Sequence, residues 1–167
     1  DNLDELGRLS IKDLQKIKGI GEAKAVAITA ALELGRRRHT SDSLNRKTIR
    51  NSREIAEFLR TTLKDFNYEV FAVLFLNQAN RIKHFEIISR GGITGTVADP
   101  RIILKKAVEE GATSIVLSHN HPSGNLKPSR ADEELTQKIK QAASFFDIRV
   151  LDHVIVSEEG YYSFADE

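Results

Sequence analysis

The chain has 167 residues, with 25 Lys or Arg against 24 Asp or Glu, 40% hydrophobic residues and no Cys. This predicts a globular protein with one ordinary core and a small additional domain. No run approaches the about 18 apolar residues of a membrane span, and the polar start is unlike a signal peptide, so we expect no membrane partner. Without Cys, disulfides and thiolate chemistry are excluded, and a metal would need His and carboxylate ligands. Because the chain starts at Asp1 without Met, we expect a longer protein with an incomplete first element.

Charge is distributed unevenly along the sequence. Residues 1–47 carry ten Lys or Arg against seven Asp or Glu, a net charge of +3, while the remainder has a net charge of −2. The first segment is therefore the candidate for a polyanion partner. The run Arg36–Arg38 is more typical of a solvated helix end than of a binding patch.

The first elements are helical. A helical series of apolar residues ends at the glycine turn 18–21, and a second helix runs from Ala25 to Gly35. The polar residues 36–43 have no periodicity and indicate a linker. We therefore predict a small all-α domain over residues 1–45 and a larger domain over 46–167.

The larger domain alternates helices and strands. Helices are predicted after Asn51, from Pro100 and from Ser129, at residues that favour helix starts. Extended segments are predicted at residues 69–76, 81–89, 113–118, 149–157 and 161–164. This interleaving predicts an α/β fold with a mixed β-sheet flanked by helices.

Two histidines and an aspartate form the main chemical motif. His119 and His121 follow a buried strand at i and i+2, so both imidazoles can face one ion. Asp132, eleven residues further on, lies in the first turn of the next helix and can return a carboxylate oxygen. Two His and one carboxylate leave a fourth tetrahedral position for water, which is the layout of a catalytic zinc site.

A purely structural interpretation of the same helix start must be weighed. Ser129 and Asp132 also fit a capping box, in which both side chains satisfy backbone groups. Taken alone, this pair favours capping, although both roles can coexist. The combination of His119, His121, Pro122, Ser129 and Asp132 behind a buried strand is much harder to explain by chance.

The pattern His119-x-His121-x7-Ser129-x-x-Asp132 resembles the zinc signature of JAMM (MPN-type) metalloproteases. The segments 119–124 and 128–132 are similar in particular to the bacterial RadC family, over about residues 48–167. The resemblance implies a cytidine-deaminase-like JAMM/MPN sandwich and a bacterial cytoplasmic protein. Asn120 departs from the Ser or Thr that JAMM deubiquitinases usually have there, which argues against ubiquitin-like substrates.

The resemblance also implies roles for these residues. His119, His121 and Asp132 would bind one Zn²⁺ per chain, and Ser129 would help to hold the oxyanion. A strand carboxylate would act as general base and then acid. Glu69, at the head of the predicted strand 69–76, is our choice, although it also fits a solvated strand start. Glu86 is the weaker candidate.

The segment Leu14 to Ile28 is similar to the helix-hairpin-helix motif of non-specific DNA-binding proteins. There, glycines such as Gly19 and Gly21 let backbone N–H groups approach a phosphate. Lys18 and Lys24 would add positive charge. The alternative is a helical hairpin used only for packing or protein contact.

The expected function is zinc-dependent hydrolysis of an amide or isopeptide bond in an unknown peptide or protein substrate, in a DNA-associated context. One alternative is a metal-dependent DNA phosphodiesterase, for which a mononuclear site without a second carboxylate cluster is poorly suited. Another is a non-catalytic scaffold in DNA repair or recombination. Neither the substrate nor the choice of divalent metal follows from the sequence.

Overall fold

The structure is a computed structural model that describes residues 3–44, 48–91 and 98–167. The chain divides into two compact units, Asp1–Ser43 and Leu44–Glu167.

The first unit is helical. It contains α1 (Leu3–Gly7), α2 (Ile11–Gln15) and α3 (Glu22–Leu44). Ser10 caps α2 in a capping box with Asp13, and Leu14 and Ala25, on either side of the glycine turn, are both buried. A helix, a turn and a longer helix therefore occupy the segment where a hairpin was predicted.

The predicted linker at residues 36–43 is wrong, because the backbone of α3 continues helically to Leu44. This segment has no Pro or Gly to end the helix, and Arg has a good helix propensity. Arg36 also pairs with Glu33 one turn earlier, with 2.8 Å between Nη2 and Oε2. The lack of apolar periodicity therefore did not mark the end of the helix.

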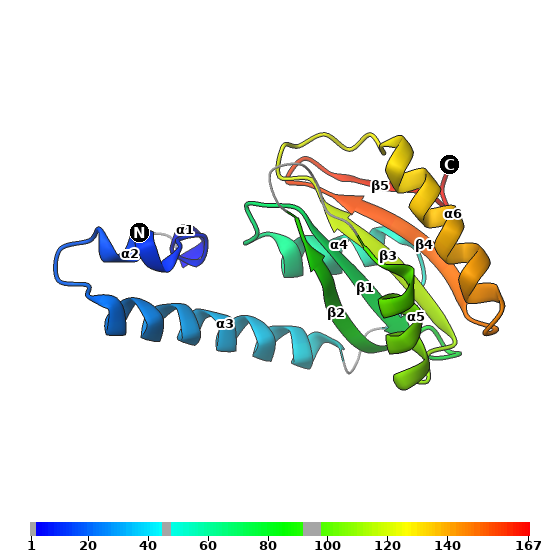
Figure 1. The fold of residues 1–167 in the computed structure, drawn as a ribbon, viewed down its shortest axis with the longest axis horizontal. Coiled ribbons are helices and arrows are strands. Elements are labelled where there is room, and N and C mark those ends of the chain that lie inside the picture. Colours follow the sequence, from blue (N-terminus) through cyan, green and yellow to red (C-terminus); the bar gives the residue numbers. More distant parts are fainter. Residues whose placement is uncertain (1–2, 45–47, 92–97) are drawn as a thin grey trace. The chain divides into compact units, whose positions relative to one another are not determined.

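The second unit is built on a five-stranded sheet with strand order β2-β1-β3-β4-β5 (Figure 1). The strands are β1 (Val70–Leu76), β2 (Ile82–Arg90), β3 (Ser114–Asn120), β4 (Arg149–Val156) and β5 (Tyr161–Ser163). Only β3 and β4 pair in parallel, so the sheet is mixed. In this α/β layout β3 is the central strand, and both of its neighbours shield it from water.

Helices cover both faces of this sheet. Helix α4 (Ser52–Leu63) lies on one face, whereas α5 (Pro100–Glu109) and α6 (Arg130–Ser144) lie on the other (Figure 1). Each face has its own hydrophobic cluster, one with Phe58 and Leu59 of α4 and the other with Ile103 of α5 and Ile139 of α6. The prediction of a mixed sheet flanked by helices is confirmed.

The helix starts follow the predicted capping residues. Asn51 caps α4, Asp99 caps α5 with Pro100 in its first turn, and Ser129 caps α6. The strand predicted to end at Ser118 instead continues to Asn120. No helix within the described segments is long and apolar enough to span a bilayer.

Candidate metal centre

The two histidines of the motif come from the end of β3. His119 pairs with Phe71 of β1 and with Ile155 of β4, and the residue is only 4% exposed. His121 follows the strand directly, and its backbone N–H still donates to the Val156 carbonyl at 2.9 Å. The extended backbone therefore continues through both residues, and their side chains project to the same side.

Helix α6 brings Asp132 to these histidines. Its Oδ2 accepts hydrogen bonds from the backbone N–H of Ser129 at 2.8 Å and from the Ser129 hydroxyl at 2.6 Å. Its Oδ1 lies 3.5 Å from Nε2 of His119. The helix cap and the contact with His119 thus use different oxygens of one carboxylate.

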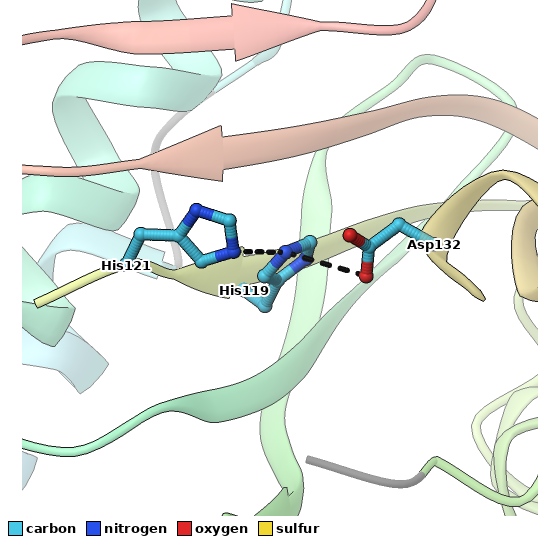
Figure 2. A group of neighbouring side chains, drawn as sticks. All are labelled: His119, His121 and Asp132. Carbon is cyan, nitrogen blue, oxygen red and sulfur yellow. Dashed lines mark hydrogen bonds and ion pairs between the residues drawn. The ribbon is translucent and has the colours of Figure 1, made fainter. Parts of the chain in front are cut away.

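Three ligand atoms converge between β3 and α6 (Figure 2). Nε2 of His119 lies 3.0 Å from Nε2 of His121, and one atom from each of His119, His121 and Asp132 lies within 4.8 Å of the others. A tetrahedral zinc ion with bonds of about 2.0 Å has ligand–ligand distances of roughly 3.3 Å. The spacing of this group fits such an ion.

The protonation of the histidines also fits a cation. Nδ1 of His121 hydrogen bonds to the carbonyl oxygen of Asn125, so this nitrogen carries the proton and Nε2 keeps its lone pair. Burial lowers the pKa of His119 to about 4, although the charge of Asp132 opposes this shift. Two imidazoles and one carboxylate form a donor set that suits zinc.

Two residues behind His119 were not predicted as part of the site. Nδ1 of His119 lies 2.9 Å from Nε2 of His153 on β4, and Nδ1 of His153 lies 2.6 Å from the hydroxyl of Thr136 on α6. Burial lowers the pKa of His153 well below its usual range. His153 contacts the side of the His119 ring opposite Asp132, so it is not a fourth ligand. The only sequence signal was a histidine in the predicted strand 149–157, next to Asp152 and followed by the apolar residues 154–156.

Asn120 points to the other face of β3 and binds the segment that leads into β1. Its Oδ1 accepts a hydrogen bond from the backbone N–H of Val70 at 2.7 Å, and its Nδ2 donates to the Tyr68 carbonyl at 3.1 Å. Glu69 lies between these two anchored residues. The residue between the histidines therefore fixes the backbone around the proposed base.

The two candidate bases lie in different surroundings. Glu69 is half-buried immediately before β1, and its carbonyl accepts a hydrogen bond from Gly91 at 2.7 Å. Glu86 lies within β2, where its carboxylate is 3.3 Å from Nζ of Lys106 and 3.4 Å from Nε2 of His84. The ion pair with Lys106 of α5 explains the presence of a carboxylate at position 86 without a catalytic role.

The hydroxyl of Ser129 is engaged within the helix cap. It accepts a hydrogen bond from the Asp132 N–H at 3.2 Å and donates to Oδ2 of Asp132. A hydroxyl has one hydrogen to donate. An oxyanion role for Ser129 would therefore require that hydrogen to leave Asp132.

The proposed DNA-contacting residues lie together in the first unit. Gly19 has φ +92°, which side chains rarely tolerate, and a Cβ built on Gly19 or Gly21 would meet no atom within 4 Å. Nζ of Lys24 donates to the Gly19 carbonyl at 3.0 Å, while Lys18 lies in the exposed turn. Open space therefore lies beside both glycines.

Comparison with known proteins identifies the family of this chain. Residues 49–167 match the family described as RadC-like JAB domain. A UPF0758 protein of Flavobacterium johnsoniae is 48% identical over 166 residues, which cover 99% of this chain and 72% of the relative. UPF0758 proteins of Streptococcus sanguinis and Chlorobaculum tepidum are 41% and 43% identical over 166 and 164 residues, covering 99% and 98% of this chain and 73% of each relative. The chain is a member of the RadC family.

Proposed function

We propose that this protein is a zinc-dependent hydrolase of JAMM type that cleaves an amide or isopeptide bond. The observation that carries the proposal is the convergence of Nε2 of His119, Nε2 of His121 and an oxygen of Asp132. Membership of a JAB-domain family is consistent with metal-dependent hydrolysis. A metal bound there would lower the pKa of a coordinated water and polarise the substrate carbonyl.

The remaining chemistry is assigned to the protein's own carboxylates. Glu69 would accept the proton that the attacking water loses and return it to the leaving nitrogen. It lies two residues before Phe71, which pairs with His119, and residues two apart in an extended backbone project to the same face of a sheet, which supports this assignment. The capping box with Ser129 at the start of α6 would hold the Asp132 carboxylate in position to bind the metal.

Metal analysis of the purified chain tests the site. We expect one zinc per chain in the wild-type protein and none in His121→Ala. His84→Ala is the matched control, because His84 is a histidine on β2 that contacts Glu86 and not the three ligands. A wild-type protein that binds no zinc after incubation with the metal would overturn the proposal and favour the scaffold function.

Activity assays separate the two enzymatic functions. A peptide and isopeptide library and a set of DNA substrates should be tested with the zinc-loaded protein in parallel. Turnover of an amide that His121→Ala lacks would support the hydrolase, whereas metal-dependent cleavage of DNA alone would support the phosphodiesterase.

We further propose that the first unit contacts DNA through its backbone phosphates. Support comes from the open glycine turn that leads into the 23-residue helix α3 and from the nearby charges of Lys18 and Lys24. The full chain should bind DNA of any sequence, with an affinity that falls as salt rises. Lys18→Ala and Lys24→Ala should each reduce the slope of log K against log salt by about 1.

The exposed Lys105 of α5 serves as the control for this experiment, because it lies in the other unit and pairs with Glu109. Lys105→Ala should leave the slope unchanged. Equal slopes for all three variants and the wild type would indicate that the turn serves packing or protein contact instead.

A further inference from the structure

A buried chain of hydrogen bonds joins one proposed metal ligand to the backbone of another. It runs from Nδ1 of His119 to Nε2 of His153, from Nδ1 of His153 to the Thr136 hydroxyl, and from that hydroxyl to the Asp132 carbonyl at 2.6 Å. The four residues come from β3, β4 and α6. The chain therefore links the three elements that meet at the site.

The direction of every hydrogen bond in this chain follows from its last acceptor. A backbone carbonyl can only accept, so the single hydroxyl hydrogen of Thr136 goes to Asp132. Thr136 must then accept from Nδ1–H of His153, which leaves Nε2 of that neutral ring without a proton. This nitrogen in turn accepts from Nδ1–H of His119. Nε2 of His119 therefore keeps its lone pair, and it is the nitrogen that lies nearest to His121 and Asp132.

We propose that His153 and Thr136 are positioning residues that hold His119 in the tautomer and orientation needed to bind the metal. The inference deepens the proposed function and rests on the metal site assigned there. Ligating histidines generally donate their second N–H to an acceptor that fixes the ring. Here the acceptor is the imidazole of His153. The Nδ1–H of that ring is held in turn by the hydroxyl of Thr136 on α6.

The surroundings of His153 explain why its ring can serve as a fixed acceptor. The side chain is fully buried, and the ring of Phe164 stacks on it with 4.8 Å between centroids and 7° between planes. Phe71 meets it edge-on at 5.6 Å. A buried imidazole is costly unless its nitrogens are satisfied, and both nitrogens of His153 have partners. The packing therefore permits very little rotation of the acceptor.

Long-range ¹⁵N NMR of the histidine rings tests the proton positions in the metal-free protein. We expect the Nδ1-protonated form for both His119 and His153 in the wild type. In His153→Phe, which keeps a ring but removes the acceptor, His119 should lose this preference. Zinc affinity should then fall by about 10- to 100-fold, measured by competition with a chelator.

Thr136 allows a second pair of variants that change the packing of the core less. Thr136→Val keeps the shape of the side chain and removes its hydroxyl, so it should lower zinc affinity and disturb the tautomer of His153. Thr136→Ser restores the hydroxyl and should restore both properties. His84→Phe is the matched control and should change neither. If His153→Phe does not fold, the Val and Ser variants decide the question.

The failures of the inference and of the proposed function are distinguishable. A wild-type protein that binds no zinc overturns the proposed function. A wild-type protein that binds zinc, but whose His119 is protonated at Nε2 without metal, overturns the positioning role alone. If His153→Phe and Thr136→Val both bind zinc as tightly as the wild type does, the positioning role is likewise overturned and the proposed function is not.

Discussion

Ser129 and Asp132 hold each other at the start of α6, through hydrogen bonds of 2.6 and 2.8 Å to one carboxylate oxygen, while the other oxygen faces His119. Ser129→Ala should therefore lower the free energy of unfolding by about 1 kcal/mol, as expected for a lost helix cap. It should also weaken zinc binding, because Asp132 loses a constraint on its orientation. Calorimetric titration of zinc and denaturant unfolding measure the two effects.

Asn51→Ala is the matched control for this prediction, since Asn51 caps α4 in the same unit through the N–H of Glu54. It should cost similar stability and leave zinc affinity unchanged. An equal loss of affinity in both variants would show that general destabilisation, and not the orientation of Asp132, weakens the site.

Glu69→Gln should keep the bound zinc and lower turnover by about 100- to 10,000-fold, the usual contribution of a general base. Glu86→Gln should retain activity, because Glu86 pairs with Lys106 of α5. Zinc content and initial rates on a substrate from the library measure both variants. Full activity in Glu69→Gln together with lost activity in Glu86→Gln would exchange the two assignments.

Asn120→Ala should destabilise the protein by about 1–3 kcal/mol, because it leaves the buried N–H of Val70 without its acceptor. Amide hydrogen exchange at Val70 should accelerate, and turnover should fall with zinc retained, since the backbone on both sides of Glu69 loses its anchor. Asn77→Ala is the control, because Asn77 makes two similar hydrogen bonds in the turn before β2. Unchanged exchange at Val70 would contradict the anchoring role.

Chelation of the metal should lower the thermal stability of the wild-type protein. A ligand that binds only the folded state at 100 times its Kd contributes about 2.7 kcal/mol. A scan with and without EDTA should therefore show a lower melting temperature without metal. His121→Ala should melt at the same temperature in both conditions, and a chelator effect of equal size in this variant would place the bound metal elsewhere.

Local sequence determined the helix starts and the pairing of the two histidines. Asn51, Asp99 and Ser129 cap helices through their own side chains within four residues, so their effect needs no knowledge of the rest of the fold. The projection of His119 and His121 to one side follows from the geometry of an extended chain. The linker predicted after Gly35 was wrong, because the backbone of α3 continues through residues that have no apolar periodicity.

Only the tertiary structure decided which residues contact the candidate metal ligands. His153 is 34 positions from His119, and a register shift between Ile115 and Val116 decides that it reaches the same face. Beyond the shift Val116 pairs with Asp152, so Leu151 is left without a partner on β3 and His153 pairs with Leu117. Strict alternation from Val150 would have turned His153 toward α4. The sequence determined the ligand motif because its spacing is local, whereas strand register and the docking of α6 supplied the partners that orient it.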